Sequence, residues 1–327
     1  MSRVAVIDGM KPEAYQRHLL HAEDCVWVEK NCYVDLWIEL LNSLGLEPRA
    51  CMGFTLAVDF EGDQWTFFKP SHDELRELYG VDVQELTVWR PLIDHAIEHL
   101  AAGKWISTEA DAYWLPDTAG TDYRHQHTKT TIVLNDIDVE AKRLGYFHNA
   151  GYFTLEGEDF VKTFRLDVEG EDASFLPLFA ELVRIDRLVR RPLDELKSQA
   201  RALLRKHLGR QPRDNPIERF RERFQRDLPG LQSAGLATYH RWAFASIRQL
   251  GAASELMAQH LEWLAEEEFS VSIGAYRQIA NASKALILKA ARAVNSGRPL
   301  DASPAFAEMS QAWEAGSQAL LNWQPRS

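Results

Sequence analysis

The spacing of apolar residues divides the chain into two parts. From residue 29 to about residue 155, short segments in which apolar and polar residues alternate are interleaved with short segments of helical spacing. From residue 156 onward, apolar residues recur every three or four positions, which is the period of a helix packed on one side. The pattern predicts an α+β protein, with a mixed α/β domain over residues 1–155 and an all-α helical domain over residues 156–327.

The same pattern, together with the residues that bound each segment, predicts the individual elements. Strands are expected over 50–60, 64–70, 104–116, 129–138 and 142–153, where β-branched and aromatic residues are frequent. Helices are expected over 32–44, 71–80, 91–102, 174–191, 193–208, 216–227, 236–268, 272–294 and 303–323.

The first of these helices opens with a cysteine. Asn31 is its predicted N-cap and Cys32 its first helical residue, and Gly45 ends it. A thiol in this position lies against unpaired backbone N–H groups and the positive end of the helix dipole, which favour the thiolate. Cys32 is therefore a candidate nucleophile. The alternative is a small buried residue that fills a gap beneath the helix.

Composition limits the classes of protein that remain. The chain has 327 residues, of which 46% are hydrophobic and 26% charged, the balance of a soluble globular protein with a large core. The N-terminal residues lack the layout of a signal peptide, and no apolar run has the length of a membrane span, so we expect a cytoplasmic protein with no membrane partner. The three cysteines form no CxxC pair, so neither a disulfide framework nor a zinc site is expected.

Charge is unevenly distributed along the chain. The net charge is −11, and because residues 156–327 are close to neutral, the first part carries nearly all of it. Within the second part, basic residues far outnumber acidic ones between Arg184 and Arg226. These basic residues are either the solvated faces of helices or a docking surface for an acidic partner. Nothing in the sequence indicates nucleic-acid binding.

Candidate partners for the cysteine lie at the ends of two expected strands. His127 comes just before the segment 129–138, and Asn149 lies in the segment that follows. A thiolate nucleophile needs a base, and the imidazole needs a third group to fix its orientation, so Cys32, His127 and Asn149 could form a Cys-His-Asn triad. For His125 the leading alternative is metal binding, since His-x-His on a strand places both rings on one face. No third ligand with suitable spacing follows, so no metal is expected.

Four stretches of the first part show a family resemblance: "NCYVDLWIELLNSLG", "DAYWLPDT", "YRHQHTKTTIVLNDID" and "LGYFHNAGYF". Together they resemble the BtrH-like family, the N-terminal domain of the butirosin-pathway acyltransferase and its relatives, which is a branch of the papain-like cysteine-peptidase fold. The resemblance covers most of residues 20–155. Taken whole, the chain is similar to a bacterial family with the same two-part layout, domain of unknown function 1839.

The resemblance implies roles for particular residues. The family's cysteine, its Asp-x-Tyr-x-Leu-Pro-like strand and its histidine are matched by Cys32, by "DAYWLP" beginning at Asp111, and by His127. The family's third member is commonly an aspartate, whereas this chain has Asn149 in the corresponding place. No glutamine stands in the usual oxyanion position before Cys32, which leaves its backbone N–H and the Asn31 side chain as candidate donors. Asp111 either binds an amine of the acceptor or is an ordinary strand residue, and His125 would support the site.

The implied function is acyl transfer through a thioester on Cys32. The resemblance implies a donor acyl or aminoacyl group carried on the phosphopantetheine of an acidic acyl or peptidyl carrier protein, and a small amine as acceptor, with no cofactor bound by the chain itself. A hydrolase with the same triad, either a thioesterase, an amidase or a peptidase, is one alternative. A catalytically inactive binding protein is the other. The sequence predicts no oligomeric state.

Overall fold

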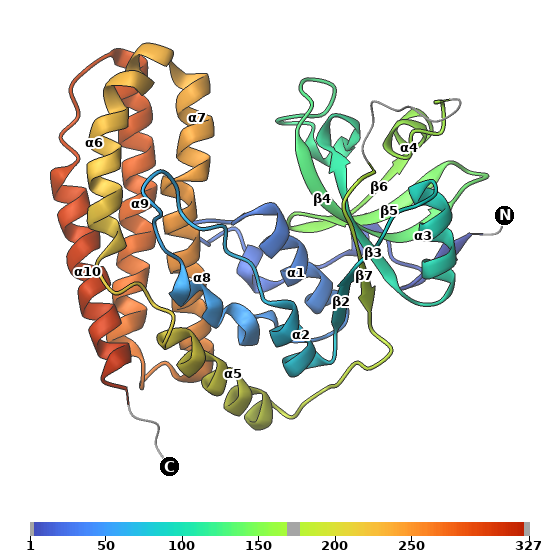
Figure 1. Ribbon diagram of the computed structural model, residues 1–327, viewed down its shortest axis with the longest axis horizontal. Coiled ribbons are helices and arrows are strands. Elements are labelled where there is room, and N and C mark those ends of the chain that lie inside the picture. The colour runs from blue at the N-terminus through green and yellow to red at the C-terminus, as the bar shows by residue number, and fades with distance from the viewer. Residues whose placement is uncertain (1–2, 169–176, 324–327) are drawn as a thin grey trace. The chain divides into compact units, whose positions relative to one another are not determined.

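Segments of the chain alternate between two units (Figure 1). The structure is a computed structural model that describes residues 3–168 and 177–323. The sheet unit comprises Met1–Leu19, Asn31–Leu46 and His72–Arg190, and the helical unit comprises Leu20–Lys30, Glu47–Ser71 and Arg191–Ser327. This division differs from the sequence-based boundary at residue 155. Residues 156–190 contain a strand of the sheet, and two early segments pack with the helices.

The sheet unit is built on an antiparallel sheet of seven strands. They are β1 (Val4–Ala5), β2 (Asp82–Glu85), β3 (Trp105–Asp111), β4 (Lys129–Asp138), β5 (Arg143–His148), β6 (Gly151–Glu156) and β7 (Ala180–Arg184). Their order is β2-β7-β3-β4-β5-β6, and β1 pairs with β4. The helices of this unit are α1 (Cys32–Ser43), α2 (His72–Tyr79), α3 (Leu92–Ala101) and α4 (Glu158–Thr163). The expectation of an α+β fold is confirmed.

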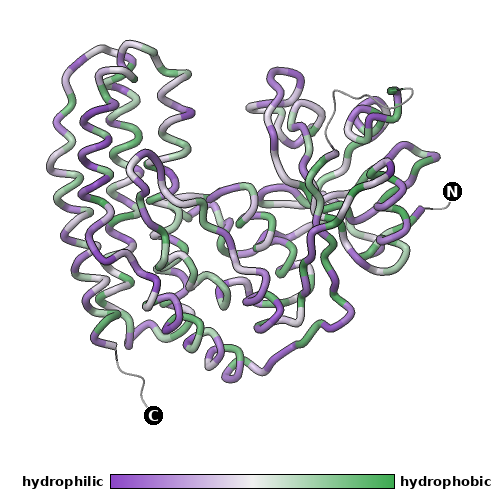
Figure 2. The backbone as a smooth tube through the Cα atoms, in the orientation of Figure 1, coloured by the Kyte–Doolittle hydropathy of each residue, from purple (hydrophilic) through white to green (hydrophobic). Residues whose placement is uncertain are grey.

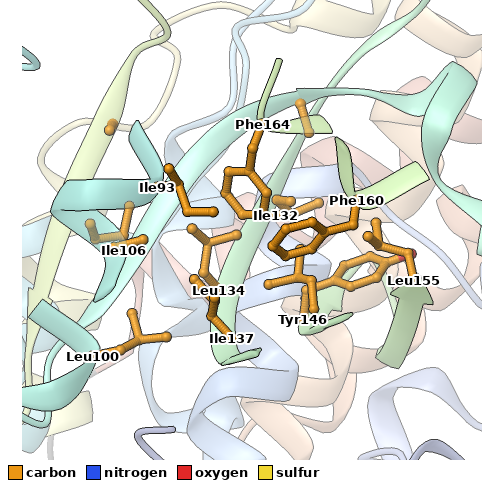
Figure 3. Close-up of a cluster of buried hydrophobic side chains, with 14 of the residues drawn as sticks. Ile93, Leu100, Ile106, Ile132, Leu134, Ile137, Tyr146, Leu155, Phe160 and Phe164 are labelled. Carbon is orange, nitrogen blue, oxygen red and sulfur yellow. The ribbon is translucent and has the colours of Figure 1, made fainter. Parts of the chain in front are cut away.

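One face of the sheet carries an apolar core (Figure 3). Ile132 and Leu134 of β4 and Tyr146 of β5 point into it and meet Ile93 of α3 and Phe160 of α4. Because successive residues of a strand point to opposite faces, the residues between these positions face the other way. The register of each strand therefore decides which of its polar side chains lie on the core face.

Helix α1 lies on the face opposite this core. The hydroxyl of Tyr33 on α1 donates to the carboxylate of Glu181 on β7, with O–O distances of 3.0 and 3.2 Å. Ala180, the residue before Glu181, belongs to the core cluster, so the alternation of the strand puts Glu181 on the opposite face. The start of α1 therefore lies over the face away from the core.

The α-helices of the helical unit are α5 (Leu193–Leu208), α6 (Pro216–Ala234), α7 (Leu236–Ala245), α8 (Ile247–Ala265), α9 (Ser270–Ser296) and α10 (Ser303–Leu321). Figure 2 shows hydrophobic and hydrophilic positions alternating along them, as amphipathic helices require. On α8, Glu255 accepts hydrogen bonds from the backbone N–H of Val26 at 2.7 Å and of Trp27 at 2.9 Å. Among the described residues, every helix is too short or too polar to cross a membrane.

Most long, periodic segments form the elements expected of them. The helices predicted over 32–44 and 193–208 are α1 and α5, and the strand predicted over 129–138 is β4. The helix expected over 236–268 is instead divided into α7 and α8 at Ser246, which has φ −121° and ψ −85°.

Three of the expected elements are wrong. Residues 50–60 are not a strand, because Pro48–Ala57 form a 3₁₀ helix buried on nearly all sides, where alternation carries no information. Residues 64–70 form no strand either, and only Trp65 pairs, in an isolated bridge with Phe60. Part of the helix expected over 174–191 is strand β7, while residues 174–176 lie outside the described residues.

A buried asparagine connects the sheet to the N-terminal segment. Asn135 has no exposed surface and lies where the β4–β5 register shifts. Its Oδ1 accepts from the backbone N–H of Ile7 and from Nε1 of Trp105, both at 3.0 Å. Its Nδ2 donates to the Ile7 carbonyl at 3.0 Å and to the Tyr152 hydroxyl at 3.2 Å. One amide thus satisfies polar groups on β3, on β6 and on the segment after β1.

Replacing this amide should destabilise the sheet unit. Asn135→Ala leaves the buried indole N–H of Trp105 and the partly buried backbone N–H of Ile7 without an acceptor, so we expect the free energy of unfolding to fall by about 2–4 kcal/mol. Urea unfolding measures the change. Asn281→Ala is the matched control, because Asn281 is exposed and donates only to Arg277 of its own helix. Equal losses in the two variants would contradict the prediction.

Candidate functional site

Cys32 is the first residue of α1, as the sequence predicts. The Oδ1 of Asn31 accepts from the backbone N–H of Tyr33 at 3.2 Å and of Val34 at 2.9 Å, the geometry of an N-cap. The Cys32 side chain is partly exposed, whereas Cys51 is buried. The sequence therefore locates the helix start correctly, and the expected burial of Cys51 is confirmed.

The thiol of Cys32 is not acidified by its position. Burial raises its pKa above the ordinary value, and the nearby carboxylate of Asp35 raises it further. The backbone N–H groups of Tyr33 and Cys32 and the ammonium of Lys129 act in the opposite direction, but they do not reverse the shift. The expectation that the helix start makes this group a thiolate at rest is wrong, because loss of hydration outweighs the helix terminus.

The position of Cys32 relative to the paired strands β3 and β4 follows from its neighbour Lys129. The ammonium is close enough to Cys32 to act on its pKa, and it forms an ion pair with Glu109 at 2.8 Å. Lys129 also lies directly opposite Asp111 in the β3–β4 ladder, so the two residues share a face of the sheet. The sulfur therefore lies toward the end of the ladder where β3 ends and β4 begins.

His127 is held at this same end of the ladder. Its Nδ1 lies 2.5 Å from Oδ2 of Asp111, and its ring stacks on Tyr113 with centroids 4.4 Å apart and planes 14° apart. An ionised carboxylate can only accept a hydrogen bond. The contact with Asp111 therefore places the ring proton on Nδ1 and leaves Nε2 as the hydrogen-bond acceptor. The ring is 69% exposed, and within residues 3–168 and 177–323 its Nε2 has no hydrogen-bond partner. One ring nitrogen of His127 is therefore held by Asp111, and the ring is open to solvent.

Asn149 lies in the turn between β5 and β6, not within one strand over 142–153. Its φ of +43° is left-handed, a conformation that asparagine tolerates better than most residues. No hydrogen bond joins its side chain to His127 among the described residues. The structure thus gives His127 a different partner, Asp111, which was expected either to bind an amine of the acceptor or to be an ordinary strand residue.

His148 lies on the core face of the sheet, away from Cys32. Its Nε2 is 2.7 Å from the hydroxyl of Thr130, and its Nδ1 is 2.5 Å from Oδ2 of Asp117. Asp117 also accepts a hydrogen bond from the hydroxyl of Tyr146. His148 is 1% exposed, so this network is part of the packed interior.

The other predicted site residues have separate positions. His125 lies in the exposed turn before β4 and not on the strand, so the argument that places it on one face with His127 does not apply. Across the described part of the chain, no group of three His, Cys, Asp or Glu side chains could hold a metal ion. The oxygen of Asn31 is used by the helix cap, so an oxyanion role would fall to its amide nitrogen.

A groove adjoins Asp111, the residue paired with His127. It has a volume of about 330 Å³, and Asp111, Trp114, Lys162, Thr163 and Arg165 are among its lining residues. The ammonium of Lys162 lies 5.8 Å from the centre of the Trp114 ring. The groove thus combines an aromatic surface with groups of both charges next to Asp111.

Three arginines of the basic segment Arg184–Arg226 form ion pairs within the helical unit. Arg219 binds Asp59 at 2.6 Å, Arg221 binds Glu218 at 2.7 Å, and Arg223 binds Asp227 at 2.7 Å. These pairs favour the interpretation of this segment as helix faces that hold the unit together. They weaken the alternative of a docking surface for an acidic partner.

Sequence reasoning missed two residues that organise the site. Tyr113, which stacks on His127, lies within the quoted "DAYWLP" stretch, so that stretch carried the available signal. Asp122 accepts hydrogen bonds from residues on both sides of His127, and nothing in the local pattern marks it. Both contacts form inside the connection between β3 and β4, which has no periodicity.

Comparison with known proteins gives a family match over most of the chain. A family described as the DUF1839 N-terminal domain matches residues 16–185, and the DUF1839 C-terminal domain matches residues 194–322. The break between the two matches falls close to residue 190, where the last segment of the helical unit begins. No curated protein matches the chain.

The raised pKa of Cys32 should appear in its alkylation kinetics. Only the thiolate reacts with iodoacetamide, so in a Cys25→Ser, Cys51→Ser background the rate should rise with pH through a midpoint above about 8.5, the ordinary cysteine value. In the native chain, Cys32 should react faster than the buried Cys51. Mass spectrometry of the modified peptides measures both. A midpoint below pH 7 would instead reveal a preformed thiolate–imidazolium pair.

Proposed function

We propose an activity for this chain, which belongs to the DUF1839 family: it transfers acyl groups through a thioester on Cys32. The observation that carries the proposal is the pair formed by His127 and Asp111, 2.5 Å apart at the end of the ladder where Lys129 acts on the Cys32 thiol. A cysteine, a base and a carboxylate that orients the base are the parts that thiol acyl transfer requires.

The first half of the reaction would be acylation of the cysteine. The resting group is a thiol, so Nε2 of His127 would take its proton as the donor thioester arrives. The sulfur of Cys32 then attacks the thioester carbonyl, a new carbon–sulfur bond forms, and the donor thiol leaves with the proton from the imidazolium. No hydrogen bond joins Cys32 to His127 in the described residues, and such bonds commonly tighten only when substrate binds.

The second half would be aminolysis of the acyl-enzyme. An amine attacks the acyl carbonyl, His127 accepts the amine proton, and the Cys32 sulfur leaves and regains a proton. The backbone N–H of Cys32 and the amide nitrogen of Asn31 are the donors we propose for the oxyanion. Their place at a helix start supports this role, since the positive end of the helix dipole lies there.

The donor we propose is an acyl or aminoacyl group on the phosphopantetheine of an acidic carrier protein, following the family resemblance. The chain itself would bind no cofactor. The acceptor we propose, following the same resemblance, is a small amine.

Water in place of the amine would make the same residues a hydrolase. The two activities differ only in the acceptor, so product analysis with and without an added amine separates them. An inactive binding protein would instead show no covalent acyl intermediate with any thioester.

The proposal predicts a specific ranking of variants. Cys32→Ala should abolish the acyl-enzyme, and His127→Ala and Asp111→Asn should each slow its formation on the order of a hundredfold or more. Asp111→Asn acts by offering the imidazole an amide that can donate, which permits the wrong tautomer. Intact-protein mass spectrometry with an acyl-N-acetylcysteamine donor measures the rate.

Asn149→Ala is the matched comparison for Asp111→Asn. Its side chain makes no hydrogen bond to His127 among the described residues, so its rate should stay within a few fold of the native value. A larger loss for Asn149→Ala than for Asp111→Asn would restore Asn149 as the orienting residue. Native rates for Cys32→Ala would eliminate the proposed nucleophile.

A further inference from the structure

The connection between β3 and β4 carries His127 and is organised by one carboxylate. Oδ1 of Asp122 accepts from the hydroxyl of Thr128 at 2.6 Å and from Nε2 of Gln126 at 2.9 Å. These are the residues immediately before and after His127. A single oxygen atom therefore holds the chain on both sides of the candidate base.

The backbone of Asp122 adds to this hold. Its carbonyl accepts from the backbone N–H of His125 at 2.8 Å and of Gln126 at 3.0 Å, which closes a tight turn. Within that turn Arg124 has φ +58°, a left-handed conformation that is uncommon for a residue with a side chain. The backbone N–H of Arg124 donates to the carbonyl of Tyr113 at 3.0 Å, and Tyr113 is the residue stacked on His127.

The carboxylate of Asp122 is ionised at neutral pH. Burial acts to raise its pKa, but hydrogen bonds from Thr121, Thr128 and Gln126 lower the pKa by more, and the net shift is downward. A hydrogen bond to an ionised acceptor is roughly twice as strong as one between neutral groups. Asp122 thus has the charge state that suits a firm hold on both neighbours of His127.

We infer that Asp122 is a positioning residue that presets the backbone around His127, so that the ring meets Asp111 and Tyr113 with Nε2 directed to the reacting atoms. The inference rests on the proposed role of His127 as the base. No hydrogen bond joins Asp122 to His127 among the described residues, so Asp122 would act through Gln126 and Thr128. A misplacement of a catalytic group by about 1 Å can cost on the order of a hundredfold in rate.

A second carboxylate in the same connection has a different role and serves as a contrast. Asp117 binds His148 and Tyr146 inside the core, and its side chain is 4% exposed. Its loss should therefore lower the stability of the fold. The hydrogen bonds of Asp122 are at the surface, and its loss should affect the base more than the fold.

The experiment compares three ways of changing these contacts. Asp122→Ala removes the acceptor of the hydrogen bonds from Gln126 and Thr128, and Gln126→Ala with Thr128→Val removes the two donors. Each should lower kcat for acyl transfer from acyl-N-acetylcysteamine by about tenfold to a hundredfold with KM nearly unchanged. Asp122→Asn keeps an acceptor oxygen and should recover most of the rate.

A second readout follows the base directly. The imidazole signals of His127 in ¹⁵N-edited NMR report its tautomer and its titration. We expect the native protein to hold one tautomer and Asp122→Ala to populate both. This measurement needs no substrate, so it tests the positioning of His127 even if the protein forms no acyl-enzyme, an outcome that would overturn the proposed function alone.

Asp138→Ala is the matched control. Asp138 lies at the other end of β4, where its Oδ1 accepts from the backbone N–H of Ala141 at 2.9 Å in a turn. It should leave the His127 signals and kcat unchanged while shifting the thermal midpoint as much as Asp122→Ala does. Unchanged His127 signals in Asp122→Ala, or equal losses of kcat in Asp122→Ala and Asp138→Ala, would overturn the inference.

Discussion

The candidate site depends on the antiparallel register between β3 and β4. This register sets Asp111 opposite Lys129 and Ala110 opposite Thr130. Asp111 then shares the face of Lys129, whereas Thr130 shares the core face with Ile132. A shift of one residue would move the carboxylate to the core and put an apolar side chain beside the candidate base. The orientation of His127 is thus a consequence of strand pairing.

The two faces of the sheet use polar groups differently. On the core face, His148 is bonded to Thr130 and Asp117, and a buried imidazole without such partners would be costly. Beyond the end of the ladder, the described residues give His127 a hydrogen-bond partner on Nδ1 only, and its ring stays exposed. Two histidines with a similar carboxylate contact therefore differ in reactivity, since only His127 has a ring nitrogen that a substrate can reach.

At Cys32, two effects of the helix start oppose each other. The terminal backbone N–H groups favour the thiolate, but the packing of α1 against the sheet removes the water that would otherwise stabilise the charge. Burial is the stronger effect here. Because the resting group is a thiol, the proposed reaction requires His127 to remove its proton. The orientation of His127 by Asp111 and Tyr113 therefore matters to that reaction.

The sequence by itself determined the α+β class, the start of α1 at Cys32 and the bounds of β4. Each rests on local chemistry: an N-cap side chain bonds to its own helix, and a run such as 129–138 combines β-branched residues with turn residues at its end. Local patterns also located His127 just before its strand.

Tertiary structure decided the rest. The alternation in residues 50–60 predicts a strand, yet this segment is buried on nearly all sides in a 3₁₀ helix, so its pattern has no single meaning. Asn149 was expected to orient His127, but a left-handed turn at that residue ends β5 before it. The partner of His127 is Asp111, 16 residues away along the chain. Only the pairing of β3 with β4 brings the two together, because a contact across a ladder depends on register, which no single segment encodes.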